Sequence, residues 1–80
     1  TIAPNPTTDV FSLEFNIEKY AEAVVIIYDD LGRQLIKKDD QILYAGRNKI
    51  SLSLTDYKAG IYFVSLSINN ARIVKQIIKK

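Results

Sequence analysis

The chain has 80 residues and a formal net charge of +2, and its 48% apolar and 25% charged residues are the balance of a soluble globular domain. It contains neither cysteine nor histidine, which removes disulfides, the commonest zinc ligands, the thiol nucleophile and the usual general base near neutral pH. We therefore expect no enzyme, no cofactor and no metal site. No apolar run reaches the roughly 20 residues of a membrane-spanning helix. No signal peptide opens the sequence, so if the protein is exported, its export signal is expected upstream.

The first predicted elements are an extended linker and a strand. Pro4 and Pro6 push the residues before them out of the helical region, which suits a linker that leaves an upstream domain. We expect residues 1–8 to be that linker and residues 9–80 to form the domain, with the first strand beginning near Asp9. Every second residue of this strand is apolar, as on a strand with one buried face.

The middle of the chain predicts a central strand and a more polar edge. Residues 22–29 are almost continuously apolar, as in a strand that is covered on both faces. Residues 29–33 predict a type I turn with Gly32 in the left-handed conformation, closing a bulged hairpin. Residues 33–45 are polar and less regular, which favours one or two edge strands. Another glycine turn is predicted at residues 44–48.

Three further strands are predicted near the end of the chain. Residues 48–55 and 60–68 alternate between apolar and polar side chains, and residues 56–60 predict a crossing between sheets. The two asparagines at 69–70 suit a two-residue hairpin, because asparagine tolerates positive φ. The apolar residues of 71–79 also fit one face of a helix. The shortness of that segment, its isoleucines and the preceding turn favour a strand.

Turn signals recur at intervals of roughly 8–12 residues, which is typical of an all-β sandwich. The sequence therefore predicts an all-β, immunoglobulin-like antiparallel β-sandwich of six to seven short strands. Tyr62, two residues after Gly60, has the spacing of the tyrosine corner of such sandwiches. The predicted core consists of Phe11, Leu13, Val24, Ile26, Leu52, Leu54, Tyr62, Val64 and Leu66. With so few strands, the first or last strand is expected to leave an open edge, and we expect a weak homodimer formed by edge-strand pairing.

Paired carboxylates and tyrosines are the candidate ligand-binding groups. The pairs at residues 29–30 and 39–40 are predicted at opposite ends of one strand, roughly 20 Å apart. A calcium site needs six to eight converging oxygens, so we favour turn capping, and the same separation disfavours a two-carboxylate glycosidase. Tyr20, Tyr44 and Tyr57 are the tyrosines expected to be exposed and could form a sugar-binding face, but nothing in the sequence places them together.

The last ten residues carry a charge asymmetry. Residues 71–80 contain four basic and no acidic side chains, whereas residues 1–70 contain seven basic and nine acidic ones. A basic strand can mark a nucleic-acid surface. No aromatic side chain lies among these cations, so we expect a solvated face and no nucleic-acid partner. We also expect the chain to be structured, or recognised, up to Lys80.

Four motifs in a fixed order resemble a known family. They are Pro4, Asn5 and Pro6 at the start, an aliphatic strand into Tyr-Asp-x-x-Gly-Arg that ends at Gly32 and Arg33, Ala-Gly-Ile-Tyr at residues 59–62, and Lys-x-x-x-Lys at residues 75–79. Over essentially the whole chain, this pattern is similar to the type A C-terminal sorting domain of the type IX secretion system of Bacteroidetes. One small departure is Asp30, where that family often has an apolar residue.

The resemblance implies a sorting function. In that family the domain follows a secreted cargo and directs it from the periplasm through the outer-membrane translocon. A surface sortase then cleaves near the N-terminal side of the domain, so that the cargo is attached to the cell surface or released. The implied partners are translocon and sortase proteins and the upstream cargo domain. The sorting-signal candidates are Gly60, Tyr62, Lys75, Lys79 and Lys80. The alternative is an immunoglobulin-like accessory or spacer module of an extracellular enzyme, with carbohydrate as a candidate ligand.

Overall fold

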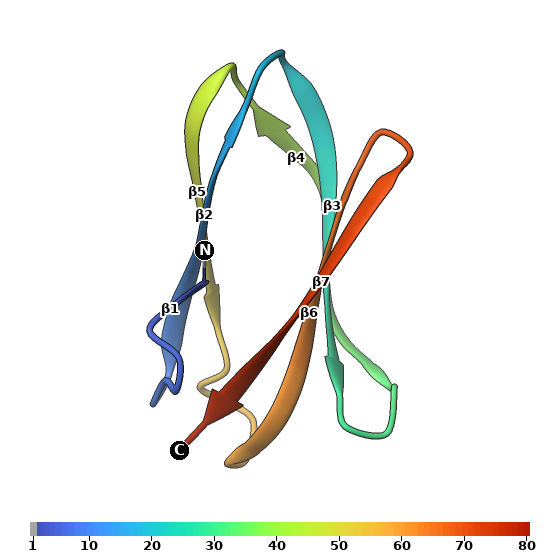
Figure 1. Cartoon of the computed structure of the whole chain (residues 1–80). Coiled ribbons are helices and arrows are strands. Elements are labelled where there is room, and N and C mark those ends of the chain that lie inside the picture. The colour runs from blue at the N-terminus through green and yellow to red at the C-terminus, as the bar shows by residue number, and fades with distance from the viewer. Residues whose placement is uncertain (1) are drawn as a thin grey trace.

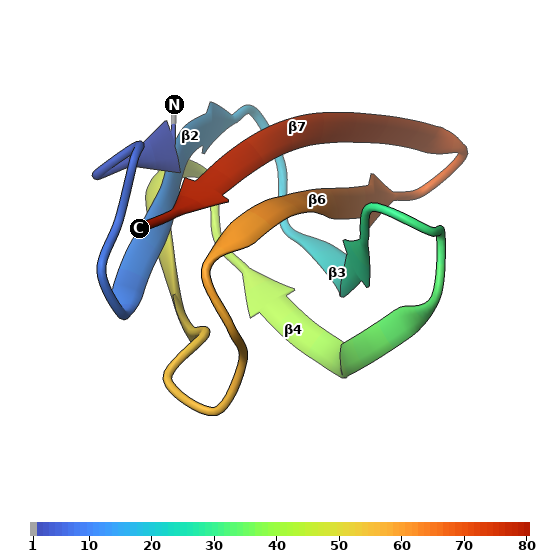
Figure 2. The same ribbon diagram turned by 90° about the horizontal axis from the view of Figure 1, so that it is seen from below.

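The computed structural model describes residues 2–80, and that part of the chain contains seven strands and no helix. The strands are β1 (Ile2–Ala3), β2 (Val10–Ile17), β3 (Ala21–Asp29), β4 (Gln34–Leu43), β5 (Gly46–Ser53), β6 (Gly60–Ile68) and β7 (Ala71–Lys79). They form two antiparallel sheets, whose arrangement is shown in Figure 1 and Figure 2. The predicted all-β sandwich of six to seven strands is confirmed.

The two sheets have three and four strands. The smaller sheet has the order β1-β2-β5 and the larger one the order β4-β3-β6-β7. The β3–β4 and β6–β7 hairpins lie within the larger sheet, whereas the connections after β2, β4 and β5 cross between the sheets. The crossing predicted at residues 56–60 and the interior position predicted for β3 are therefore confirmed. In constant-type immunoglobulin domains the fourth strand joins the first, second and fifth strands, whereas here β4 joins β3.

The strand predicted near Asp9 is β2, but it is not the first strand. Ile2 and Ala3 form β1, which pairs antiparallel with β2, and Ile2 packs against the core. The expectation that the first strand begins near Asp9 is wrong, because a two-residue strand before a proline is too short to show an alternating pattern. The division of the chain between residues 8 and 9 stays a prediction.

The core lies between the two sheets, and most of its predicted members are there. The residues that are buried as expected are Phe11, Leu13, Leu52, Leu54, Tyr62, Val64 and Leu66. The expectation for β3 is wrong by one residue: Val25 and Ile27 are 1% and 0% exposed, whereas Val24 and Ile26 are only partly buried. An unbroken apolar run has no alternation, so pairing with the neighbouring strand decides which face turns inward. β3 pairs with β6 in the register that aligns Ile27 with the buried Val64.

The predicted turns are present, and the polar stretch after the first of them is one bulged strand. Gly32 and Asn69 have positive φ angles of 82° and 53°. β4 runs through Asp39 and Asp40, with Asp40 at a φ of 53° and irregular pairing with β3. The expectation that this carboxylate pair lies beyond the end of a strand is wrong, because a bulge accommodates the unusual residue and lets the strand continue. The bulge and the charges make this sheet edge unsuited to pairing with another chain.

β7 forms the other edge of the larger sheet. Residues 71–79 are therefore a strand, as predicted, and not a helix. β7 pairs with β6 along its whole length. Its buried side chains, Ile77 and Lys79, belong to its C-terminal half, whereas Ile73 and Val74 are 53% and 48% exposed. The last strand is thus anchored in the molecule near its end.

The register of β3 can be tested with a matched pair of substitutions. Ile27→Ala should lower the free energy of unfolding by about 2–5 kcal/mol, because it leaves a cavity at a fully buried position. Ile26→Ala removes the same atoms from the outer face and should cost less than about half as much. Urea denaturation followed by circular dichroism would measure both losses. Equal losses at the two positions would contradict the register.

Candidate functional site

The motifs that carry the family resemblance meet at one end of the sandwich. This lower end in Figure 1 holds the β1–β2 connection, the β3–β4 turn, the β5–β6 crossover and the end of β7. We call it the motif end and define it as residues 4–9, 29–33, 54–62 and 76–80. Its hydrogen bonds join residues from the two ends of the domain, and one of them links Asn5 to Ile78.

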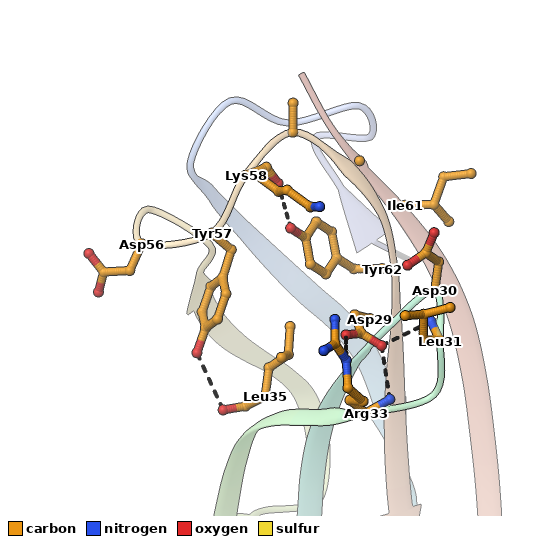
Figure 3. Close-up of a pocket in the computed structure, with 12 residues that line it drawn as sticks. Asp29, Asp30, Leu31, Arg33, Leu35, Asp56, Tyr57, Lys58, Ile61 and Tyr62 are labelled. Atoms are coloured by element: carbon orange, nitrogen blue, oxygen red, sulfur yellow. Dashed lines mark hydrogen bonds and ion pairs between the residues drawn. The ribbon is translucent and has the colours of Figure 1, made fainter.

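Asp29 organises the turn between β3 and β4 (Figure 3). Its Oδ1 accepts hydrogen bonds from the backbone N–H groups of Leu31 and Arg33, each at 2.9 Å. Its Oδ2 accepts a hydrogen bond from Arg33 Nε at 2.6 Å, and this contact is also an ion pair. The turn capping predicted for the first carboxylate pair is therefore present at Asp29.

The same contacts determine the ionisation of Asp29. Burial raises the pKa of this carboxyl group, since the residue is only 7% exposed. The hydrogen bonds from Arg33 and Leu31, together with the guanidinium charge, act in the opposite direction and outweigh burial. The pKa of Asp29 consequently lies below its ordinary value, and the carboxylate is stable in its ionised form.

Gly60 and Tyr62 shape the start of β6. Gly60 has a φ of +157°, which side chains of L-residues rarely allow, and no atom lies within 4 Å of the place where a Cβ would stand. The need for glycine therefore comes from the backbone conformation and not from crowding. Tyr62 is 4% exposed, and its hydroxyl donates a hydrogen bond to the carbonyl oxygen of Lys58. This contact is the tyrosine corner that the Gly-x-Tyr spacing predicts.

Lys79 is a buried cation that fastens the end of β7 to the crossover. The residue is 9% exposed, and its Nζ donates hydrogen bonds to the carbonyl oxygens of Leu54 at 2.6 Å, Thr55 at 3.4 Å and Tyr57. The Asp9 carboxylate lies 3.9 Å from the same nitrogen. These oxygens replace the water that the ammonium group loses on burial. The lysine thus joins a strand at the sheet edge to the loop that crosses between the sheets.

The opening motif lies alongside the end of β7, where both ends of the domain come together (Figure 2). The N–H group of Thr7 donates to the carbonyl oxygen of Ile78, and the carbonyl oxygen of Thr7 accepts from the N–H group of Lys80, both at 2.8 Å. Asn5 extends this pairing through its side chain. Its Nδ2 donates to the carbonyl oxygen of Gln76 at 3.0 Å, and its Oδ1 accepts from the N–H group of Ile78 at 3.1 Å.

The five sorting-signal candidates do not form one surface patch. Gly60, Tyr62 and Lys79 lie together at the motif end, with the tyrosine and lysine side chains buried. Lys75 and Lys80 are exposed, but Lys75 lies four residues along the strand from Lys79, or about 13 Å at the rise of a strand. The structure therefore divides the candidates into a buried group with structural contacts and two separate exposed cations. Recognition of any of them by a partner stays a prediction.

Tyr20 and Tyr44 are in contact at the opposite end of the sandwich, which the sequence does not predict. Their ring centroids are 5.9 Å apart with an interplanar angle of 62°, and the residues are 57% and 65% exposed. They meet because the β2–β3 and β4–β5 connections cross between the sheets at the same end. This edge-to-face pair provides no flat two-ring surface. Tyr57 lies elsewhere and packs edge-on against Tyr62.

A pocket at the motif end lies between the β3–β4 turn and the β5–β6 crossover (Figure 3). Two of its charged groups, Asp29 and Arg33, already bind each other within the turn. In the range 2–80, no three His, Cys, Asp or Glu side chains are grouped as metal ligands. The same range contains no helix of the length and apolarity that a membrane crossing requires.

Sequence reasoning missed the contacts of Asn5, Thr7 and Lys79. Asparagine and lysine are common at exposed positions, and their partners here are 71 and 25 residues away along the chain. No local pattern could have found these contacts. The role of Asp29 had a local signal, because an aspartate at the start of a turn often accepts hydrogen bonds from the backbone that follows it.

Asp29→Asn should make the domain less sensitive to acid. Because the pKa of Asp29 is lowered in the folded chain, its contribution to stability is complete above the unfolded pKa near ~4 and is lost as the pH falls towards the folded pKa. Thermal unfolding measured between about pH 7 and about pH 2 should show a shallower acid loss of Tm in the variant. Asp30→Asn, which changes an exposed neighbour, should keep the wild-type slope. Identical slopes for the wild type and Asp29→Asn would contradict the role of this carboxylate.

Lys79→Met should destabilise the domain by about 1–3 kcal/mol, because three carbonyl oxygens of the crossover would lose the ammonium as a donor while the apolar stem is kept. Lys80→Met is the matched control. That lysine is exposed, so its replacement should change stability by less than about 0.5 kcal/mol. Urea titrations of the two variants would compare them directly. A similar small effect at both positions would show that the buried ammonium does not hold the strand.

A family comparison agrees with the motifs and their arrangement. The family model described as the secretion system C-terminal sorting domain matches residues 1–80, the whole chain. No curated protein and no solved structure matches the chain. The chain therefore belongs to the family of C-terminal sorting domains of the type IX secretion system.

Proposed function

We propose that this domain directs an upstream cargo protein through the outer-membrane translocon of the type IX system and is then removed by a surface sortase. The route runs through the periplasm to the cell surface or the medium. The observation that carries the proposal is the family match over residues 1–80. The family is one of sorting signals and not of enzymes. The meeting of the motifs at one end, around the last strand, supports the proposal.

We further propose that the translocon reads β7 and its hairpin with β6. Two mechanisms are compatible with the placement of the side chains. Lys75 and Lys80 are exposed and can attract an acidic surface, an attraction that salt would weaken. Alternatively, the outer edge of β7 can pair with a strand of a receptor. Lys79 is unsuited to the first mechanism, because its ammonium group is buried among backbone carbonyl oxygens.

The same sheet edge supports the expected weak homodimer. In the described residues, only one named strand pairs with β7, and the opening segment covers only the last residues of its other edge. The unpaired part of that edge can take up a strand of a second copy. Arg72 and Lys75 of both copies would then lie close together, and this like-charge repulsion keeps the pairing weak. Sorting and self-association would therefore use the same edge.

The cargo junction is proposed at residues 1–8, and the sortase cut near it. Asn5 and Thr7 are hydrogen-bonded to β7, so this junction would lie directly beside the motif end. Cleavage and recognition would then take place at the same end of the domain.

An export assay tests the proposal. Residues 1–80 are fused to a periplasm-targeted reporter in a host that has the secretion system. The wild-type fusion should place the reporter outside the cell, and deletion of residues 71–80 should leave it in the periplasm. A double substitution, Lys75→Gln with Lys80→Gln, keeps the buried lysine and separates the two mechanisms. Lost export would favour attraction by charge, whereas retained export would favour edge pairing.

The control for the double substitution is Lys19→Gln with Lys49→Gln, which removes the same charge from exposed positions outside β7. This control should export normally. Because the deletion removes a whole strand, each fusion is also checked for folding by limited proteolysis. If the deletion variant still exports its reporter, β7 is not the sorting signal, and the alternative of an accessory or spacer module is favoured.

A further inference from the structure

The outer edge of β7 is covered along half of its length by the domain's own opening segment. In an antiparallel strand the N–H and C=O groups of one residue point to the same side of the strand, and those of the next residue point to the other side. In β7 the residues that point away from β6 include Gln76 and Ile78, because their backbone groups bond to Asn5 and Thr7. Lys80 continues the series with its N–H group, which donates to Thr7.

The other half of this edge has no neighbouring strand in residues 2–80. By the same alternation, the backbone groups of Arg72 and Val74 and the N–H group of Gln76 point away from β6. β7 is the outermost strand of its sheet in the part of the chain that the structure describes. The edge therefore consists of an exposed upstream half and a covered downstream half on one continuous strand.

Residues 4–7 bond to β7 as a parallel strand would, although two of them are prolines without a backbone N–H group. Thr7 forms a parallel bridge with Lys79 through its backbone, whereas Asn5 uses its side-chain amide to bond Gln76 and Ile78. Two prolines flank Asn5, and proline has no backbone N–H group to donate. A side-chain amide, which has a donor and an acceptor side by side, takes the place of a peptide group.

The cover is weakly held in comparison with the core. Pro4, Asn5 and Pro6 are exposed, and only Thr7 is buried, at 2% exposure. Both hydrogen bonds of Asn5 are open to solvent. Segments with few buried contacts and solvent-exposed hydrogen bonds open at the lowest free energies in a domain. Residues 4–6 are therefore the part of the cover that opens most easily, and Thr7 has to leave its buried site as well for the edge to open as far as Lys80.

We propose that residues 4–7 are a removable cover on the outer edge of β7, and that lifting them exposes a continuous strand-binding edge over residues 72–80 for an acidic extended strand of a partner. Three exposed cations, Arg72, Lys75 and Lys80, and no acid in residues 71–80 argue for an acidic partner. The cover competes with the partner for the same backbone groups and does so intramolecularly, at high effective concentration. The apparent affinity of the partner is reduced by the fraction of time for which the edge is covered. The inference concerns the strand of the proposed function, but its test needs no secretion system, so either can fail alone.

Amide hydrogen exchange tests the cover in the 80-residue chain. Asn5→Ala removes both side-chain bonds to β7, so the amides of Ile78 and Lys80 should exchange at least about tenfold faster, while the Ile27 amide in β3 keeps its rate. Lys80 is the decisive position, because its amide donates to the carbonyl oxygen of Thr7, a residue that Asn5→Ala does not change. Asn16→Ala, at an exposed asparagine of β2, is the control and should alter neither amide. An unchanged rate at Lys80 would overturn the cover.

The unmodified chain gives a second measurement that does not depend on the folding of a variant. If residues 4–7 lift as one unit, the amides of Ile78 and Lys80 should have protection factors equal within about threefold and well below that of Ile27. Protection at both positions as high as at Ile27 would mean that the edge opens only by global unfolding, and would overturn the inference.

Binding of a defined probe tests the edge itself. The probe is a synthetic peptide of alternating glutamate and valine, eight residues long, with blocked termini. Its charge-reversed control has lysine in place of glutamate. The acidic peptide should bind the Asn5→Ala chain at least about tenfold more tightly than the wild type, and salt should weaken it. Chemical-shift changes should centre on residues 72–80. Equal affinity for the two chains, equal binding of the lysine peptide or no binding to either chain would overturn the strand-binding role.

Discussion

The buried ammonium group of Lys79 is the contact on which the arrangement of the last strand depends. An edge strand of a small sandwich has one neighbouring strand and little area to bury, and most side chains of β7 are exposed. Lys79 extends across the end of the sandwich and donates to carbonyl oxygens of the β5–β6 crossover. Those carbonyl oxygens belong to a loop, where the backbone has no ladder partner to satisfy it. One side chain thus satisfies the loop and holds the strand.

The neighbouring contacts act on the same end of the molecule. Asp29 closes the β3–β4 turn, Tyr62 ties the start of β6 to the crossover, and Asn5 with Thr7 bonds to the last residues of β7. Each of these groups bonds to backbone atoms, and Asp29 is also paired with the Arg33 guanidinium. The family motifs are for this reason chiefly the residues that build one end of the fold. Their value as a signal would lie in the shape they hold rather than in a set of exposed groups.

β7 combines a fixed half with an exposed half. Its C-terminal residues are held by Lys79, by the buried Ile77 and by the opening segment. Its first residues present an open edge, with Ile73 and Val74 about half exposed. The opposite edge of the same sheet is interrupted by the bulge of β4 and by its charges. Within this sheet, pairing with another strand is therefore directed to β7, which agrees with a domain whose last strand is proposed to be recognised.

The sequence by itself determined the class of fold, the positions of the turns and the family. Alternating runs, a glycine and two asparagines at turns, and the Gly60-x-Tyr62 spacing are local features that short-range backbone preferences make readable. Only the tertiary structure decided which side chains of β3 turn into the core. An unbroken apolar run can bury either face, and the choice is made by the pairing that aligns Ile27 with Val64 in β6. The tertiary structure also decided that Lys79 is buried while Lys80 is exposed, and that Asn5 bonds to β7. The energy of these contacts comes from backbone carbonyl and N–H groups that lie far away in the chain and are supplied by any residue type, so no sequence pattern could reveal them.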